Sequence, residues 1–577
     1  MPVRKLSGYI RPYYLYIAFT MLIKLGGAVA ELFVPFFMER ILREGVVPGQ
    51  ENRIYIYGGL MLLCAGVCVT MNILANRMSA ISSGRITRKL RYDLFEKLNS
   101  LSARQMDRLT IASAESRLTS DTYRVNEFLA RGQRLGVRAP ILLVGGLAMM
   151  LMMDPRLALV LFALLPLIAL SVWLITKKSI PLYTREQGIL DSMVRVVTEN
   201  VTGIRVIKAL SKTDYERGRF ETVNEALTET DARAGAISAL NNPISSLVLN
   251  LGLTLVVVIG AYQVAAGRTQ TSVIVAFLQY FVMILNAMRG ITRIFIMVSR
   301  ASASAQRVAQ VLETSAEMEP EPGQAEAEAD APHIEFRDVS FSYSGIGHDV
   351  SHLSFRLERG QTLGIMGATG SGKSTVVNLL MRIYDPDSGQ VLIGGRDVRT
   401  IDRKTLRGYF GAVFQNDFIT EGTIADNVRF FRDIPDEAVE RAVEDAQAEE
   451  FIAEKEGGLD FQVAIRGNNL SGGQKQRLLI ARALAGAPEI LILDDASSAL
   501  DYRTDAKLRA ALQHRHSDVT TVLIAQRISS VKNADLILVL DDGKVIGQGT
   551  HEELLETCEE YRLIARTQMG AGEEAAG

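Results

Sequence analysis

Two adjacent carboxylates, Asp494 and Asp495, follow the apolar run ILIL at residues 490–493. A continuous apolar run of this kind is typical of a strand that is buried on both faces of a parallel sheet. Carboxylates at the end of such a strand can hold a Mg²⁺ ion and polarise a water molecule beside a nucleotide. The pair therefore predicts nucleotide chemistry, provided that the chain also has a loop that binds phosphate.

A glycine-rich loop with this property follows the apolar stretch 361–366 and has the sequence GATGSGKS at residues 367–374. Glycines in this pattern let backbone N–H groups converge on phosphate oxygens. Lys373 would reach the β- and γ-phosphates and Ser374 would ligate Mg²⁺, with Asp494 as the acid beside that ion. The residues of this loop that are predicted to bind ATP are Gly367, Thr369, Gly370, Ser371, Gly372, Lys373, Ser374 and Thr375.

The C-terminal part has the other patterns of a soluble α/β domain. Residues 536–549 are typical of a hairpin that turns at Asp542–Gly543. Thr550 is expected to cap the closing helical stretch, with Glu553 completing a capping box. These patterns place the phosphate-binding loop in a sheet domain with short connections.

The N-terminal half instead has apolar stretches that are long enough to cross a membrane as helices, which takes about 20 residues each. Six such spans are predicted, at residues 13–37, 54–76, 136–153, 156–176, 244–266 and 271–292. The loops 77–138 and 177–243 between them are long and rich in Lys and Arg, whereas the turns after the third and fifth spans are short. Since such an excess marks the cytoplasmic side, both termini are expected in the cytoplasm.

The long loops have helical periodicity, as residues 81–101 illustrate, and helices that reach into the cytoplasm indicate a device that transmits motion. Residues 313–332 are rich in Glu, Ala and Pro, which is typical of a flexible acidic linker. The expected fold is therefore a membrane α-helical domain at 1–312, the linker, and an α/β P-loop domain at 333–577.

Composition excludes several other classes of protein. A net charge of -2 gives no electrostatic argument for a nucleic-acid partner. The three cysteines, Cys64, Cys68 and Cys558, are too few and too scattered for a disulfide framework. No cleavable signal is expected, because the first apolar stretch is too long for one. The expected location is a cell membrane, with the prokaryotic plasma membrane favoured.

The motifs GATGSGKST, VFQND, LSGGQKQR, LILDDASSALD and GQGTHEELL occur in this order between residues 367 and 555. They resemble the sequence motifs of ATP-binding cassette (ABC) transporters, and residues 199–210 resemble the second cytoplasmic loop of the exporters in that family. Six spans followed by one cassette resemble the plan of an exporter half-transporter. The resemblance covers nearly the whole chain and implies that two chains clamp two ATP molecules head to tail.

The resemblance also implies roles for single residues. Tyr343 would stack on adenine, and Gln415 would contact Mg²⁺ and the γ-phosphate. Ser471 and Gly473 would contact the γ-phosphate bound by a second chain. The residues of this signature segment that are implied to bind ATP are Ser471, Gly472, Gly473 and Gln474. The family's Gly-Glu before the signature is replaced by Ala464-Ile465, for which the sequence offers no physical reason.

Two further positions depart from the family pattern. The family has a glutamate that polarises water and a histidine that contacts the γ-phosphate, where this chain has Asp495 and Gln526. Aspartate is shorter by one C–C bond of about 1.5 Å, and a misplacement of about 1 Å can cost about 10²-fold in rate. Gln526 carries no charge but can still hydrogen-bond phosphate or position water. The pattern resembles one half of the asymmetric exporters, and predicts slow hydrolysis and a homologous but different partner chain.

The membrane part gives less information about the substrate. Lys24 and Glu31 lie seven residues apart in the first span, and therefore on one helical face about 10 Å apart. Charges in a membrane usually face a cavity or a partner, so Glu31 is a candidate for a translocation cavity or a structural ion pair. Lys24 is expected to pair or to extend towards the membrane surface.

By analogy with the family, the expected substrates are amphipathic drugs or related organic molecules, cations among them, that reach the protein through membrane lipid. Two alternatives remain open. One is a lipid or peptide exporter of the same fold, although the short stretch before the first span is not expected to hold the protease domain of some peptide exporters. The other is an ATP-gated regulatory or sensor protein that does not transport.

Overall fold

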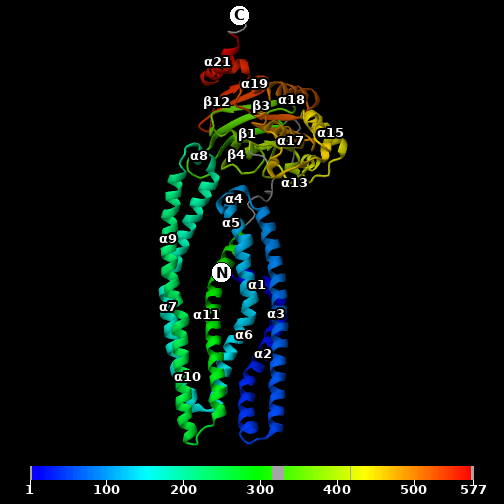
Figure 1. Cartoon of the computed structure of the whole chain (residues 1–577). Coiled ribbons are helices and arrows are strands. Elements are labelled where there is room, and N and C mark those ends of the chain that lie inside the picture. The colour runs from blue at the N-terminus through cyan, green and yellow to red at the C-terminus, as the bar shows by residue number, and fades with distance from the viewer. Residues whose placement is uncertain (1–2, 315–330, 416–417, 574–577) are drawn as a thin grey trace. The chain divides into compact units, whose positions relative to one another are not determined.

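The computed structural model describes residues 3–314, 331–415 and 418–573 of the 577-residue chain (Figure 1). The chain divides into two compact units. Unit 1 comprises Met1–Asn99 and Ala112–Thr314, and unit 2 comprises Ser100–Ile111 and Ser315–Gly577. The predicted linker at 313–332 falls largely outside the described residues.

Unit 1 consists of long helices joined by short turns. Its main helices are α1 (Val3–Ile10), α2 (Tyr14–Arg40), α3 (Glu51–Ser100), α6 (Thr122–Met153), α7 (Pro155–Thr202), α9 (Thr213–Ala239), α10 (Asn241–Ala265) and α11 (Thr271–Glu313). Its short elements are η1 (Arg11–Tyr13), η2 (Ile41–Val46), α5 (Ile111–Ser116), η3 (Arg117–Asp121) and α8 (Ile204–Ala209). The predicted helical character of both long loops is confirmed.

Five helical stretches among the described residues are long and apolar enough to cross a membrane. They are Leu6–Val46, Glu51–Ser100, Ile111–Met153, Ser246–Ala265 and Thr271–Ile291. Three of the six predicted spans, 13–37, 54–76 and 136–153, lie within these stretches, and two more, 244–266 and 271–292, match them to within two residues at either end. The remaining one, 156–176, lies in α7, where the side chains of several residues fall outside the described part, so its role as a span stays a prediction.

The turn between α6 and α7 shows how the sequence sets one of these boundaries. The Asp154 carboxylate accepts hydrogen bonds from the backbone N–H groups of Arg156 (2.9 Å) and Leu157 (3.2 Å). Pro155 occupies the first position of α7, where a missing N–H group costs nothing. Asp and Pro together therefore end one helix and start the next within two residues.

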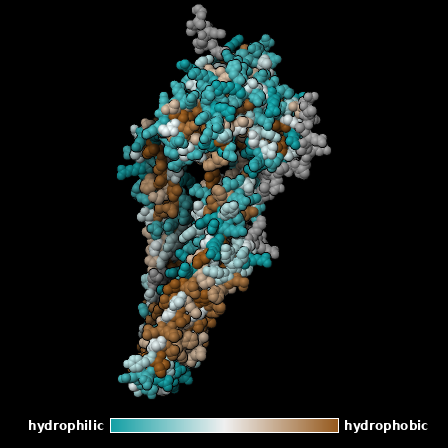
Figure 2. Space-filling model, turned by 90° about the vertical axis from the view of Figure 1, so that its right-hand side faces the viewer, coloured by the Kyte–Doolittle hydropathy of each residue, from teal (hydrophilic) through white to brown (hydrophobic). Residues whose placement is uncertain are grey.

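The core of unit 1 lies where α2, α6, α10 and α11 pack together. Its largest fully buried side chains include Met150, Phe277, Tyr280 and Phe281. The Tyr280 hydroxyl donates to the carbonyl of Leu32 at 2.6 Å, which satisfies the polar end of this buried ring. Figure 2 shows a band of hydrophobic side chains on one face of the helical unit, with hydrophilic side chains at the tip beyond it. Such a band is the surface that a bilayer core accepts.

Unit 2 is built on three sheets. The strand order is β12-β11-β3-β10-β9-β6 in the largest sheet, β2-β1-β4-β5 in the second and β7-β8 in the third. The strands are β1 (Ile334–Phe341), β2 (Val350–Leu357), β3 (Thr362–Gly367), β4 (Ser388–Ile393), β5 (Arg396–Asp397), β6 (Phe410–Val413), β7 (Gly422–Thr423), β8 (Gln462–Val463), β9 (Ile490–Asp494), β10 (Thr520–Ile524), β11 (Leu536–Asp541) and β12 (Lys544–Gly549).

Helices and 3₁₀ turns lie between these strands and on either side of them in the chain. They are α4 (Ala103–Leu109), α12 (Lys373–Leu380), α13 (Arg403–Gly408), α14 (Ile424–Arg429), α15 (Asp436–Asp445), α16 (Glu449–Ala453), η4 (Gly458–Asp460), η5 (Ile465–Gly467), α17 (Gly472–Leu484), α18 (Tyr502–Arg515), α19 (Ile528–Val531), α20 (His551–Thr557) and α21 (Glu559–Glu573). The predicted hairpin at Asp542–Gly543 and the capping box of Thr550 and Glu553 are both confirmed.

The register of the largest sheet determines which loops meet. Ile524 of β10 pairs with Ile365 of β3 on one side and with Asp494 of β9 on the other, and both pairings are parallel. The carboxyl ends of these three neighbouring strands therefore share one edge, which is where ligands bind in open α/β sheets. The loop after β3, the acidic pair after β9 and Gln526 after β10 converge there.

Helix α4 belongs to unit 2, although the sequence places it inside the first long loop of the membrane part. Ser102 caps it, and the Arg104 guanidinium donates to Asp387 and to the Ser342 carbonyl, each at 3.1 Å. The Tyr384 hydroxyl donates to the Asp107 carboxylate at 2.6 Å. Burial and the nearby Asp107 raise the pKa of Tyr384 above its ordinary value. The packing of α4 in unit 2 is not apparent from the helical periodicity alone.

Candidate functional site: a phosphate-binding pocket

The loop between β3 and α12 has the backbone geometry of a phosphate cradle. Gly372 precedes α12 with φ +98°, and a Cβ atom there would lie 2.7 Å from the carbonyl oxygen of Asp349, so only glycine fits. The Ser371 hydroxyl is buried without a hydrogen-bond partner among the described residues. Because buried polar groups are normally satisfied and the N-terminus of α12 attracts anions, the loop fits a bound phosphate.

Lys373 and Ser374, at the end of this loop, lie close to Asp494. The Lys373 ammonium donates to the carbonyls of Gly367 (2.9 Å) and Ala368 (2.6 Å). The Ser374 hydroxyl donates to the Asp494 carboxylate at 2.8 Å. Burial lowers the pKa of Lys373 and raises the pKa of Asp494, so burial disfavours the charged form of each group. A phosphate bound beside Lys373 would stabilise its charged ammonium, and a cation bound beside Asp494 would stabilise its charged carboxylate.

A pocket of about 250 Å³ opens above these residues. It is lined by Tyr343, Asp349, Thr369, Gly370, Gly372, Lys373, Ser374, Thr375, Gln415, Asp494, Asp495, Ile524, Ala525 and Gln526. Residues that are up to 183 positions apart in the chain are thus brought together, as the sheet register requires. Gly367 and Ser371 belong to the same loop but do not line the pocket.

Tyr343 presents an aromatic ring at the rim of the pocket. Phe341 and Tyr384 pack edge-on against this ring, with centroids 4.8 Å and 5.0 Å away. The Asn378 amide donates to the Tyr343 hydroxyl at 3.0 Å. The ring is 41% exposed, which leaves aromatic surface for a base to stack on.

Asp495 lies in a strained backbone conformation, with φ +52° in the left-handed region. Its carbonyl accepts hydrogen bonds from the Ser498 hydroxyl (2.9 Å) and from the Gln476 amide (3.4 Å). Aspartate tolerates this region better than most residues with a Cβ atom, because its short polar side chain can bond locally. The anchored backbone fixes the direction in which the short carboxylate leaves the chain.

Gln568 in α21 holds the segment that carries Gln526, and no sequence motif marks it for this role. Its side-chain amide donates to the Gln526 carbonyl at 2.9 Å and accepts from the Ile528 N–H at 2.8 Å. These two bonds hold the segment that carries Gln526. Gln476 and Asp349 were likewise missed. Gln476 has a detectable signal, since it lies two residues after the signature segment, whereas Gln568 lies in a tail helix without a motif.

The signature segment lies away from this pocket. Ser471 caps α17 by accepting a hydrogen bond from the Gln474 N–H at 3.3 Å, and the Gln474 side chain accepts from the Ser471 N–H at 3.0 Å. None of Ser471, Gly472, Gly473 or Gln474 lines the pocket formed by the chain's own phosphate loop. The segment thus presents a capped helix N-terminus that is not used by that pocket.

Substituting Gly372 with alanine should abolish tight ATP binding, because the added Cβ atom would displace the loop from the Asp349 carbonyl. We expect at least a tenfold weaker affinity, since strained backbone of this kind costs about 1–3 kcal/mol. Equilibrium binding of a fluorescent ATP analogue measures the effect. Gly408→Ala is the control, because a Cβ atom on this helical glycine meets no atom within 4 Å. Equal affinities for the two variants would contradict the prediction.

Two family models match the chain. The model described as ABC transporter transmembrane region matches residues 17–288, and the model described as ABC transporter matches residues 350–498. A relative from Mycobacterium tuberculosis, an uncharacterized ABC transporter ATP-binding protein, is 34% identical over 98% of this chain and 97% of its own length. The second match contains the phosphate loop, the Asp494–Asp495 pair and the signature segment.

Other relatives are of similar length. The ATP-dependent lipid A-core flippase of Vibrio vulnificus is 29% identical over 99% of this chain and 98% of its own length. The solved structure of a bacterial Atm1-family ABC exporter with ATP bound has the same fold, with a TM-score of 0.80 over 97% of this chain and 98% of that chain. At 23% identity, this structural likeness speaks for the fold alone.

Proposed function

Because the chain belongs to the ABC transporter family, as a half-transporter of the exporter type, we propose that it is the slow-site half of a heterodimeric exporter. Exporters of this kind are membrane proteins that work as dimers and couple ATP hydrolysis to transport. In such a heterodimer one chain holds the slow ATP site and the other holds the fast one. The proposal also places both termini on the cytoplasmic side, as the basic loops indicate.

The observation that carries the proposal is the pair of Asp495 and Gln526 in one pocket with an otherwise complete phosphate loop. A water molecule that attacks the γ-phosphate needs a base at hydrogen-bond distance, and the carboxylate of Asp495 is one C–C bond too short for the usual arrangement. Gln526 offers a neutral amide where a positive charge would stabilise the transition state. ATP is therefore bound and retained at this site more than it is hydrolysed.

Magnesium fits the donors that line the pocket. Ser374 and Gln415 offer neutral oxygens and Asp494 a carboxylate, which are the ligand types that Mg²⁺ prefers together with substrate phosphates. The ion would neutralise phosphate charge during hydrolysis. Among the described residues no group of three or more His, Cys, Asp or Glu side chains is placed to hold a metal, so the nucleotide would complete the site.

The signature segment of this chain would serve the partner's ATP. Ser471 and Gly473 form part of the capped N-terminus of α17, which offers a hydroxyl and backbone N–H groups to an anion. Head-to-tail pairing would place this N-terminus over the phosphate loop of the second chain. An intact signature here and a competent base in the partner would together make one fast site.

For the cargo, we propose amphipathic organic molecules that reach the protein from the bilayer. Drugs and lipids both satisfy this description. The relative named as a lipid A-core flippase supports including lipid-like amphiphiles.

Affinity purification under native conditions tests the proposal. We expect the tagged chain to retain a homologous half-transporter that has glutamate and histidine at the positions equivalent to Asp495 and Gln526, with an altered signature. Mass spectrometry of the purified complex identifies the second chain. Recovery of this chain alone, from cells that express every half-transporter of the organism, would refute the heterodimer.

A further inference from the structure

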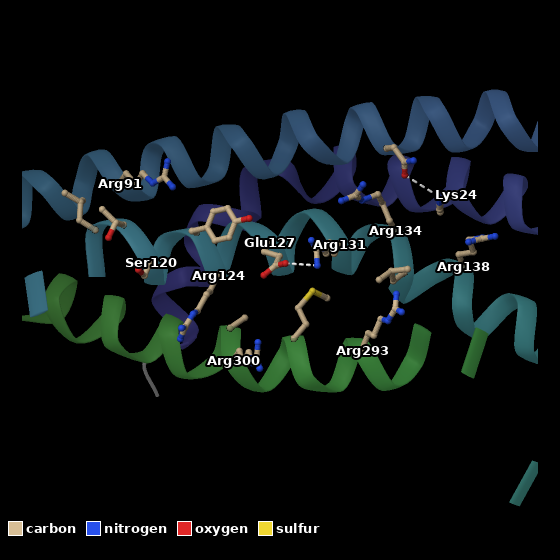
Figure 3. Close-up of a pocket in the computed structure, with 17 residues that line it drawn as sticks. Lys24, Arg91, Ser120, Arg124, Glu127, Arg131, Arg134, Arg138, Arg293 and Arg300 are labelled. Carbon is tan, nitrogen blue, oxygen red and sulfur yellow. Dashed lines mark hydrogen bonds and ion pairs between the residues drawn. The ribbon is translucent and has the colours of Figure 1, made fainter. Parts of the chain in front are cut away.

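A cavity of about 1390 Å³ lies among the helices of unit 1 (Figure 3). Side chains from α2, α3, α6 and α11 line it, and η3 closes one end. Eight of the lining residues are cationic and one is acidic. The cations are Lys24, Arg91, Arg124, Arg131, Arg134, Arg138, Arg293 and Arg300, and the acid is Glu127.

Acidic side chains neutralise only a small part of this charge. Glu127 pairs with Arg131 at 2.7 Å, and Glu31 forms two hydrogen bonds with Arg138, at 2.7 Å and 3.0 Å. Glu31 thus has a structural ion-pair partner, Arg138, and also lines the neighbouring cavity. No other carboxylate of the described residues forms an ion pair with a cation of this cavity.

Each of the remaining cations either donates a hydrogen bond to a neutral group or has no hydrogen bond among the described residues. Lys24 is 5% exposed and donates to the amide oxygens of Asn72 and Asn76. Arg91 donates to the Thr122 hydroxyl at 3.0 Å. Like charges in a partly desolvated cavity repel one another over several ångströms. An anion that enters the cavity would therefore gain free energy from all of them.

A second cavity, of about 550 Å³, adjoins the basic one and is mainly apolar. The two cavities share Leu135 and Arg138 of α6. Along one face of α6 the lining changes from arginines, ending with Arg138, to Ala139 and Leu142. Residues at this spacing lie on one helical stripe, so a single ligand can contact both parts.

Helix α11 shows the same change at the same level. Its residues that line the second cavity are uncharged and end at Gly290, and its residues that line the basic cavity begin at Arg293 and include Arg300. A Cβ atom on Gly290 would lie 3.3 Å from the Cβ atom of Ala139, which shows that α6 and α11 approach closely at this level. The apolar stretch Thr271–Ile291 also ends here. The basic cavity thus begins where the apolar span stops, as a headgroup region does.

From this arrangement we infer that the exporter binds an anionic amphiphile, with a phosphate-bearing headgroup among the arginines and a hydrocarbon part in the apolar cavity. The inference rests on the proposed export function and specifies its substrate class. Guanidinium groups bind phosphate oxygens in pairs of hydrogen bonds, which a cationic drug cannot accept. The expectation of cationic substrates is therefore replaced, because a cation would add to an excess of positive charge.

Binding to the purified, nucleotide-free full-length chain tests the inference. The probes are a fluorescent lysophosphatidic acid and three competitors, namely unlabelled lysophosphatidic acid, lysophosphatidylcholine of the same chain length, and glycerol 3-phosphate. We expect lysophosphatidic acid to compete at least about tenfold better than either of the others. The choline cation of lysophosphatidylcholine offsets its phosphate charge, so that it is not a net anion, and glycerol 3-phosphate has no hydrocarbon chain to bury. Equal competition by lysophosphatidylcholine, or by glycerol 3-phosphate, would overturn the inference.

The double variant Arg293→Gln and Arg300→Gln should weaken lysophosphatidic acid binding by at least about tenfold and leave lysophosphatidylcholine binding unchanged. The charge-matched control is Arg217→Gln with Arg233→Gln, since both arginines lie exposed on α9 and line neither cavity. If the first double variant breaks the dimer in light scattering and keeps its affinity, the arginines serve chain association and the inference is wrong. ATPase rates do not enter these measurements, so a failure of the proposed heterodimer remains a separate result.

Discussion

The chain purified on its own should gain about 10²-fold or more in ATPase rate when Asp495 becomes glutamate and Gln526 becomes histidine. The longer carboxylate would reach the attacking water, and the imidazole would offer a donor to the γ-phosphate. Without the changes, the homodimer has two slow sites and should turn over below the usual range of about 1–10³ s⁻¹. Phosphate release at saturating MgATP measures both proteins.

The control carries the same two chemical changes outside the pocket, as Asp436→Glu and Gln548→His. Both of these side chains are exposed, and neither lines the phosphate-binding pocket. This control should keep the slow rate of the unmodified chain. A homodimer of the unmodified chain that turns over at several per second would show that Asp495 is an adequate base. A double variant no faster than its control would show that Asp495 and Gln526 do not limit the rate, which also contradicts the prediction.

In the complex with its partner, Ser471→Arg should remove most ATPase activity, whereas Asp495→Ala should cost much less. The arginine would place a bulky cation where the partner's γ-phosphate meets the N-terminus of α17. Asp495 belongs to the site that hydrolyses little in any case. Lys373→Ala should be intermediate, because it weakens the ATP that holds the dimer closed and leaves the reacting ATP untouched.

Thr550→Arg provides the matched control for Ser471→Arg. Thr550 also caps a helix through a capping box, so this change removes the same kind of cap, which is worth about 1 kcal/mol, and adds the same charge. We expect near-normal activity from it. Steady-state ATPase assays on complexes with each change made singly decide the matter. Equal damage from Asp495→Ala and Ser471→Arg would mean that this chain's own site is hydrolytic.

The strands that carry the phosphate-binding pocket could be predicted because their local signals agree. The apolar run before Asp494 and the apolar stretch before Gly367 are continuous, as buried parallel strands require. The hairpin at Asp542–Gly543 has its turn residues in place. That the ends of these strands lie side by side follows from the sheet, in which β10 pairs with β3 on one side and with β9 on the other.

Other parts of the site depend on contacts between distant segments, for which local patterns carry no signal. The two bonds between Gln568 and the Gln526 segment join residues 42 and 40 positions apart. The left-handed backbone of Asp495 is held by hydrogen bonds to its carbonyl from Gln476 and Ser498, of which Gln476 lies 19 positions away. The arginines of α6 were predicted only as a mark of membrane orientation. Arg124, Arg131 and Arg138 lie seven residues apart, and this spacing could have indicated that they share one helical face.

The membership of α4 in unit 2 limits how the protein can be cut into pieces. A fragment that begins after α11 would lack the partners of Tyr384 and Asp387, although every nucleotide-binding motif would be present. The fragment would lose these hydrogen bonds and the ion pair between Arg104 and Asp387, which residues far upstream supply in the full chain. We therefore expect it to be less stable than the same domain with α4 present, and supplying residues 100–111 as a separate peptide should restore part of that stability.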